Sequence, residues 1–246
     1  MFQSSLGIVV RSTDYKDYDR ILTIFTKEFG KITAGVRGAR KQGSPLLAAS
    51  EMFCCSNYAI YRSKTRSSVN QAEVVNSFFN IRNDVKALTV ASIISDICDK
   101  TAMEDEPNPR LFALLASTLY TLDNGYDPYG TLVFFVFKAL DILGLKPHLD
   151  SCVCCGKPSV NKVNISLGGT VCEDCPGEKI SQTHLEAISR IFTVPSKNMA
   201  DNLPAVNGDF LSLAERWITH SLEFQPRGLK ILHTLTAYET YKDKPL

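Results

Sequence analysis

The sequence predicts an α+β multidomain protein, in which a five-stranded β-barrel precedes an α-helical domain with an embedded four-cysteine zinc knuckle. Three observations support this prediction. Short β-branched or aromatic runs alternate with turn-forming stretches over the first eighty residues. From residue 84 onward, apolar residues recur at the three- and four-residue spacing of helices. Two C-x2-C pairs interrupt the helical part between residues 150 and 177.

The N-terminal part, residues 1–80, is predicted to contain five short strands. Stretches rich in glycine, serine or charged residues separate the strands and favour turns. The strands are expected at residues 6–11, 21–26, 31–36, 52–61 and 69–75. Five strands in so short a segment suggest a small barrel or sandwich, and five is the strand count of an OB-fold.

Residues 81–246 are predicted to form a helical domain. Asp127 before Pro128 has the residue types of an N-cap and a first helical position, and Ser181 is a second candidate cap. Trp217 and Leu232 are expected to face the core. The helices are expected at residues 84–103, 109–122, 128–144, 181–192, 209–224 and 226–241.

The two C-x2-C pairs consist of Cys152 with Cys155 and Cys172 with Cys175, separated by a 16-residue insert. A pair at this spacing can direct both thiolates at one ion, and two pairs complete the tetrahedron that Zn²⁺ prefers. Four thiolate ligands leave no open position for a catalytic water. We therefore predict a structural zinc site with these four ligands in the knuckle at residues 150–177.

Other uses of the cysteines are weaker. A disulfide framework is disfavoured because the N-terminus lacks a secretory signal, and a C-x-x-C redox pair would need only one motif. An iron site of the rubredoxin kind and a swap of Cys154 into the ligand set stay open. Cys54, Cys55 and Cys98 are expected to be buried as small apolar side chains.

The basic charge is concentrated at the N-terminus. Residues 1–80 hold eleven Lys/Arg against six Asp/Glu, whereas the remaining residues hold 16 against 20. Residues 29–50 and 52–72 contain no acidic residue, and Tyr58 and Tyr61 lie in the second stretch. Cations that neutralise phosphates and rings that stack on bases predict a nucleic-acid surface, although surface loops are often basic without a ligand and either tyrosine could instead be a core residue. The candidate DNA contacts are Arg11, Lys16, Arg20, Lys31, Arg37, Arg40, Lys41, Arg62, Lys64 and Arg66.

Catalytic motifs are missing from the sequence. It contains no phosphate-binding P-loop, no dinucleotide-binding glycine pattern and no nucleophile elbow. The four histidines are scattered, and no carboxylate pair has a plausible acid–base setting. No apolar stretch approaches the length of a membrane span. These observations favour a cytoplasmic binding protein over an enzyme.

Three segments together resemble the RecO family of bacterial recombination mediators. They are LGIVVRSTDYKDYDRILTIFTKEFGKITAGVRGARK (residues 6–41), NIRNDVKALTVASIISDI (residues 80–97), and LGLKPHLDSCVCCG followed by GGTVCEDC. Arg37, Arg40 and Lys41 match the family's basic loop and therefore head the predicted DNA contacts.

The resemblance implies a fold, partners and an activity. The fold would be an OB-fold over residues 1–80, followed by a helical domain that carries the knuckle. The partners would be single- and double-stranded DNA, RecR, single-strand-binding protein and, indirectly, RecA, with no membrane partner. The protein would work at the nucleoid in the RecF pathway, where it would anneal strands and help RecA to load. The alternative is a zinc-ribbon transcription or translation factor that grips nucleic acid with the knuckle itself.

Overall fold

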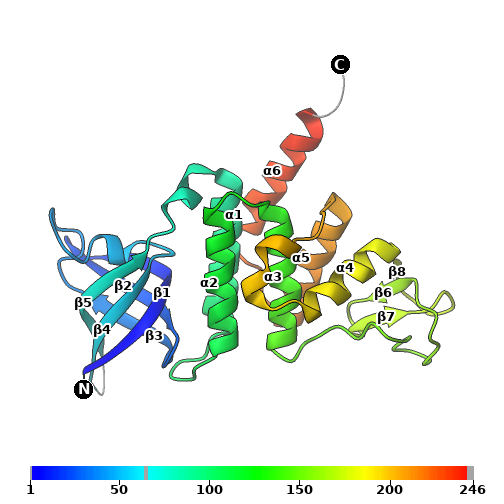
Figure 1. Ribbon diagram of the computed structural model, residues 1–246, viewed down its shortest axis with the longest axis horizontal. Helices are drawn as coiled ribbons and strands as arrows, with labels where there is room; N and C mark the ends of the chain where they lie inside the picture. Colours follow the sequence, from blue (N-terminus) through cyan, green and yellow to red (C-terminus); the bar gives the residue numbers. More distant parts are fainter. Residues whose placement is uncertain (1, 64–65, 243–246) are drawn as a thin grey trace. The chain divides into compact units, whose positions relative to one another are not determined.

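The computed structural model describes residues 2–63 and 66–242 of the 246-residue chain. Their internal contacts form two compact units, Met1–Gly125 and Tyr126–Leu246. The first contains a closed five-stranded barrel and two α-helices, and the second contains four α-helices and a small three-stranded sheet (Figure 1). The predicted fold class, a five-stranded barrel followed by helices, is therefore confirmed.

The barrel strands are hydrogen-bonded in the order β1-β2-β3-β5-β4, and the sheet closes between β4 and β1. Four of the contacts are antiparallel, and β3 pairs with β5 in parallel. This is the five-stranded Greek-key arrangement of an OB-fold. The strands are β1 (Phe2–Tyr15), β2 (Asp19–Thr26), β3 (Gly30–Val36), β4 (Cys55–Arg62) and β5 (Ser67–Asn76).

Strand β1 is much longer than the apolar run at residues 6–11 predicts. Its first half pairs with β4, from Phe2 to Ile8, and its second half pairs with β2, from Gly7 to Tyr15. A bulge beside Val9 lets the strand turn from one partner to the other. Polar residues at both ends are therefore extended because of tertiary pairing, which apolar alternation does not reveal.

The central parts of β1 and β2 are apolar on both faces. Inside the barrel, Val9 and Ile24 belong to the core cluster and are fully buried. Ile8 and Phe25 are also fully buried, although alternation directs them outward. Phe25 meets Phe112 edge to face, with ring centroids 5.8 Å apart. Two-sided burial therefore reflects the helices that cover the outside of these strands.

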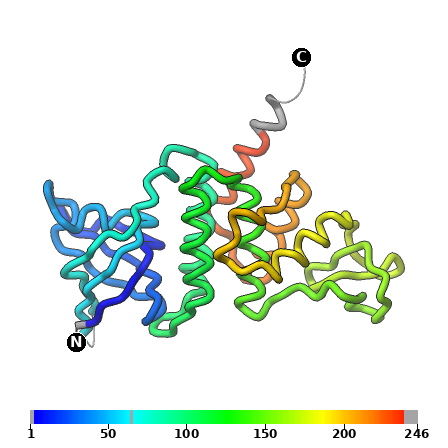
Figure 2. The backbone as a smooth tube through the Cα atoms, viewed as in Figure 1, coloured from blue at the N-terminus to red at the C-terminus, as the bar shows by residue number. Residues whose placement is uncertain are grey.

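The helices beside the barrel are α1 (Val85–Thr101) and α2 (Pro109–Asp123), which follow the 3₁₀ segment η2 (Phe79–Asn83). Asp84 caps α1 by accepting hydrogen bonds from the backbone N–H groups of its first turn. Helices α1 and α2 pack against each other, and α1 also contacts β1. The tube in Figure 2 follows the chain from the barrel into these helices. The domain boundary predicted at residue 80 stays a prediction. The compact unit Met1–Gly125 contains the barrel together with both helices.

The chain between α1 and α2 crosses the start of β3. Lys31 donates its backbone N–H to the Met103 carbonyl at 2.9 Å, and Gly30 forms a bridge with Glu104. Gly30 has a φ of +66°, and a Cβ there would lie 2.3 Å from the Glu106 carbonyl oxygen. Only glycine fits this position, for reasons of both space and backbone conformation.

Gly30→Ala is therefore expected to lower the free energy of unfolding by more than about 2 kcal/mol, because backbone of the interhelical loop must move. Gly43→Ala is the matched control, since Gly43 has a φ of +74° and nothing lies within 4 Å of its added Cβ. That change should cost only about 1–2 kcal/mol for the left-handed conformation. Urea unfolding of both variants measures the difference, and equal losses would contradict the assigned contact.

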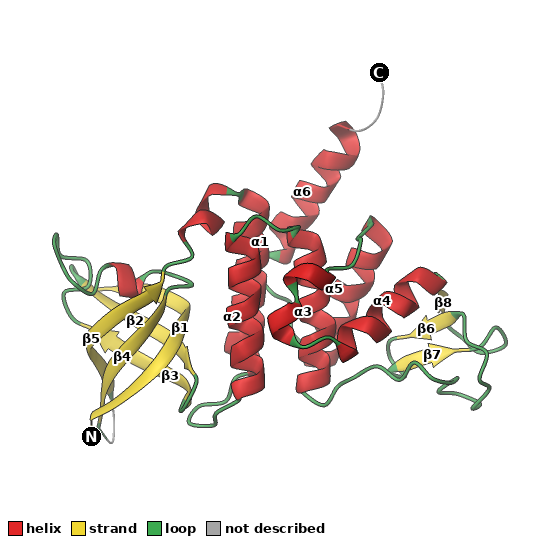
Figure 3. Ribbon diagram, in the orientation of Figure 1, coloured by secondary structure: helices red, strands yellow, loops and turns green. Residues whose placement is uncertain are grey.

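The second unit is a helical cluster joined to the knuckle (Figure 3). Phe137 of the deeply buried α3 contacts the rings of Phe210 and Trp217, each with centroids 6.1 Å away. Trp217 and Leu232 are buried as predicted. The helices are α3 (Pro128–Ile142), α4 (Gln182–Thr193), α5 (Gly208–Leu222) and α6 (Leu229–Lys242).

Capping side chains set where these helices begin. Asp127 accepts hydrogen bonds from the backbone N–H groups of Tyr129 and Gly130, and Ser181 accepts one from His184. Both predicted N-caps are confirmed. Within the described ranges, no helix combines the length and the apolar character that crossing a membrane requires.

Candidate metal centre and nucleic-acid interface

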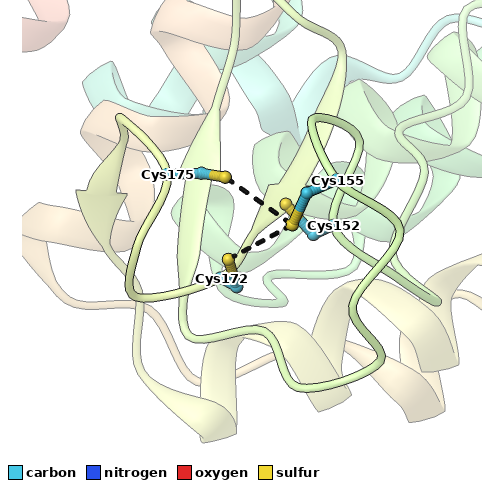
Figure 4. A group of neighbouring side chains, drawn as sticks. All are labelled: Cys152, Cys155, Cys172 and Cys175. Atoms are coloured by element: carbon cyan, nitrogen blue, oxygen red, sulfur yellow. Dashed lines mark hydrogen bonds between the residues drawn. The ribbon is translucent and has the colours of Figure 1, made fainter.

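The four predicted zinc ligands meet at one point of the knuckle (Figure 4). Their Sγ atoms all lie within 4.8 Å of one another. Cys155 Sγ is 3.6 Å from Cys172 Sγ and 3.8 Å from Cys175 Sγ. Four thiolates around Zn²⁺ at about 2.3 Å would lie roughly 3.8 Å apart, so the arrangement can hold a metal ion. A disulfide would need about 2.05 Å.

Backbone turns create this geometry. The N–H of Gly156 donates to the Cys152 carbonyl at 2.8 Å, and the N–H of Cys175 donates to the Cys172 carbonyl at 3.2 Å. Gly156 has a φ of +76°, as expected of a glycine in a tight turn around a metal. Cys154 is exposed and lies outside the group of four sulfurs.

A three-stranded sheet in the order β7-β6-β8 supports the cysteines. Cys172 directly follows β7, and with Cys152 and Val171 it forms a small buried cluster. This cluster is far smaller than an ordinary domain core. The sheet is built from β6 (Lys162–Asn164), β7 (Gly169–Val171) and β8 (Glu178–Lys179).

The thiols influence one another's ionisation. Burial opposes ionisation of Cys152, but hydrogen bonds from the backbone N–H groups of Cys172, Cys155 and Cys154 outweigh it and lower its pKa to about 6. The pKa of Cys175 is raised, because the sulfurs of Cys172 and Cys152 favour its protonated form. A divalent cation would supply the positive charge that four adjacent thiolates lack.

The other buried cysteines have no such setting. Cys54, Cys55 and Cys98 are buried, as the sequence predicts. Burial raises the pKa of the Cys55 thiol to about 11 and also raises the pKa values of Cys54 and Cys98. These thiols stay protonated and pack as small apolar groups.

The predicted DNA contacts form three groups: one lies in the loop between β4 and β5, one is bound to carboxylates of the helical segment, and one surrounds the Val36 end of β3. At this end, the basic turn (residues 37–41) lies against the hairpin tip (residues 15–19) that joins β1 to β2. The backbone N–H of Gly38 donates to Asp19 Oδ1 at 2.8 Å, and that of Arg40 donates to the Tyr18 carbonyl at 2.9 Å.

The tip cations are open to solvent to different degrees. Arg37 and Lys41 are exposed, and the described residues include no carboxylate bound to either. The Arg40 guanidinium lies 3.4 Å from Asp14. The Arg20 side chain is only 15% exposed, and its Nη1 atom lies 2.7 Å from Glu51 Oε1. Its main role is therefore structural. Arg37 and Lys41 therefore carry exposed charges, whereas Arg40 shares its charge with Asp14.

Carboxylates from the helical segment occupy three other predicted cations. Arg11 forms an ion pair with Asp99 of α1, and Lys31 Nζ lies 3.5 Å from the same carboxylate and 2.5 Å from the Asp99 carbonyl. Arg62 forms an ion pair with Asp105 in the loop after α1. These contacts hold the helical segment to the barrel.

Two predicted cations belong to the loop between β4 and β5. Arg66 is exposed there, and Lys64 lies outside the described residues. The remaining predicted cation, Lys16, is exposed at the hairpin tip.

The expected stacking by Tyr58 is wrong. This side chain is fully buried inside the barrel, and its hydroxyl donates to the Ala49 carbonyl at 2.6 Å. Tyr61 is 41% exposed. Tyr15 and Tyr18 at the hairpin tip are more exposed than Tyr61, and neither was among the predicted stacking rings. Their position in the charged segment DYKDYD (residues 14–19) could have identified them.

Comparison with known proteins agrees with this architecture. The family model described as "Recombination protein O N terminal" matches residues 1–78, and that described as "Recombination protein O C terminal" matches residues 82–229. The DNA repair protein RecO of Alkaliphilus metalliredigens is 38% identical over 174 residues, which cover 70% of this chain and 71% of the relative. That of Listeria monocytogenes serotype 4b is 33% identical over 180 residues, covering 73% and 71%. The two matched family models and these relatives show that the chain belongs to the RecO family of DNA repair proteins.

Proposed function

We propose that this protein is a recombination mediator of the RecF pathway. It binds DNA, anneals complementary strands and, with RecR, helps RecA to load onto single strands coated by single-strand-binding protein. Membership in a DNA repair family supports this role. The observation that carries it is the basic turn at residues 37–41, held by backbone hydrogen bonds at one end of an OB-fold barrel. Oligonucleotides commonly bind the β2–β3 face and adjacent loops of such barrels.

Annealing requires no chemical step by the protein. Arg37, Arg40 and Lys41 would neutralise phosphates of two strands and so reduce their repulsion, and base pairing would then drive the strands together. The protein would therefore act as a mediator at the nucleoid rather than as an enzyme.

The proposed ligand of the four-cysteine cluster is a structural Zn²⁺. Cys152, Cys155, Cys172 and Cys175 would hold it and leave no ligand position for a water. When bound, the ion would fix the two cysteine turns and the short sheet relative to one another. Elemental analysis distinguishes zinc from iron, and an iron tetrathiolate would also absorb visible light.

The knuckle itself is poorly suited to gripping nucleic acid. Lys157 lies 2.5 Å from Asp174, and Lys162 Nζ donates to the Glu173 carbonyl at 2.6 Å. Both lysines of the insert are thus engaged by the acidic segment between the second pair of cysteines. This pairing argues against a zinc-ribbon factor that uses the knuckle as its DNA-reading element.

A strand-annealing assay tests the proposed function. Complementary oligonucleotides are coated with single-strand-binding protein, and the increase in duplex is followed with and without the protein. We expect faster annealing of coated strands, with inhibition by added salt because phosphate contacts are lost. Annealing of naked strands alone would indicate a passive DNA binder, and absence of any DNA binding at low salt would refute the proposal.

A further inference from the structure

We propose that Tyr15 and Tyr18 form a stacking site for unpaired nucleobases, which makes the hairpin tip selective for single strands. This inference rests on the proposed DNA binding and adds a specific ligand, the exposed face of a base. Tyr15 is 48% exposed and Tyr18 is 53% exposed. Tyr15 is the last residue of β1, and Tyr18 is the last residue of the short turn before β2.

A lysine ammonium group lies over one face of each ring, so a base would stack on the opposite face. Lys16 Nζ lies 5.3 Å from the centroid of the Tyr15 ring, and Lys41 Nζ lies 5.9 Å from that of Tyr18. Lys41 belongs to the basic turn, so the second pair joins two loops that are distant in sequence. Ring and cation together suit a nucleotide, because the ring can stack on the base while the ammonium group neutralises a phosphate.

The tip backbone is held in place before any ligand arrives. Tyr15 pairs with Asp19 at the end of the β1–β2 ladder. The Tyr18 carbonyl accepts a hydrogen bond from Arg40, and Asp19 accepts one from Gly38. Rings on a fixed backbone lose less conformational entropy on binding than rings on a free loop, which favours a binding role.

The charges around the rings favour a polyanion only modestly. Residues 14–20 and 37–41 contain five cations and three carboxylates. Asp14 is shared between Arg20 and Arg40, and Asp19 is bound to the Gly38 backbone. Two of the three carboxylates are therefore engaged within these two segments. Five cations and three carboxylates give a net charge of only +2, so the rings would supply affinity that charge alone does not.

Stacking also explains selectivity. A base in a duplex already stacks on its neighbours and pairs with its partner, so it must be pulled out before a tyrosine can cover it. A base in a single strand offers its face at little cost. The rings should thus strengthen single-strand binding, whereas the cations strengthen binding to both forms of DNA.

The test uses the full chain with both rings removed, Y15A/Y18A. Fluorescence anisotropy measures binding of a labelled oligothymidylate and of a mixed-sequence duplex of equal length over a range of salt concentrations. Removal of a stacking ring typically weakens binding by roughly 5- to 150-fold. We expect a loss of about 30-fold or more for the single strand, less than about threefold for the duplex, and an unchanged salt slope.

Three controls separate stacking from other roles. Y15F/Y18F keeps both rings and should retain single-strand affinity. Y120A removes a ring on α2 that is 57% exposed and should change nothing. An unchanged urea midpoint for Y15A/Y18A shows that the barrel is intact.

The outcomes are distinct. Equal losses for single strand and duplex, failure of the phenylalanine variant to bind, or no loss in Y15A/Y18A would each overturn the stacking site. The last result, with normal binding by the unmodified protein, would leave the proposed function standing. Failure of the unmodified protein to bind any DNA would overturn both.

Discussion

Replacing Cys172 by serine is expected to unfold the knuckle, residues 150–177, while the unit Met1–Gly125 stays folded. The knuckle has only a small buried cluster around Cys152, Val171 and Cys172, so it cannot rely on apolar burial. Structural zinc contributes roughly 10–16 kcal/mol of apparent folding free energy in zinc-finger peptides. Loss of one ligand should therefore cost several kcal/mol locally, more than an ordinary surface substitution.

Hydrogen exchange measured by mass spectrometry checks this result, together with elemental analysis for zinc. Amides of residues 150–177 should lose protection in C172S and after treatment with a strong chelator. C154S is the matched control, because Cys154 is exposed and lies outside the sulfur cluster. Knuckle protection that survives both zinc loss and C172S would contradict a metal-stabilised fold, and equal damage by C154S would contradict the ligand set.

Charge reversal of the basic turn, R37E/R40E/K41E, is expected to weaken single-strand binding by at least about 100-fold at low salt. Three phosphate contacts would be lost and three repulsive charges gained. Because each contact with a single strand contributes about 0.7 to the slope of log K against log salt, the slope should fall by about 2. Stability should change little, since Arg37 and Lys41 are exposed.

Anisotropy titrations at several salt concentrations measure both quantities. The matched control is K179E/K197E/K230E, which reverses three exposed lysines in the unit Tyr126–Leu246. This control should leave most of the affinity in place. If it costs as much as the reversal in the basic turn, net charge rather than the barrel tip governs binding, and the assignment of Arg37, Arg40 and Lys41 fails.

Local patterns in the sequence were sufficient for the fold class and the cysteine cluster. A C-x2-C pair brings two sulfurs together through one turn, so its geometry hardly depends on the rest of the chain. Helix starts were predictable for the same reason, since Asp127 and Ser181 cap the residues that directly follow them. The full length of β1 was not predictable, because its polar ends are extended only through pairing with β2 and β4.

The arrangement of the cations depends on contacts between distant residues. Lys31 and Asp99 are 68 positions apart, and nothing in the local sequence announces their contact. The burial of Tyr58 was predictable in part, because Tyr58 and Ile60 are two residues apart in a strand and must share a face. An apolar Ile60 inside the barrel implies that Tyr58 lies inside as well.

The ion pairs of Asp99 and Asp105 mean that formal charge overstates the electrostatic field at the barrel surface. Arg11, Lys31 and Arg62 form ion pairs within the chain, and the carboxylates of these pairs cancel their electrostatic field at short range. Added salt would thus have two separable effects on this protein. It would weaken DNA binding through the tip cations, and in the absence of DNA it would loosen the helical segment from the barrel.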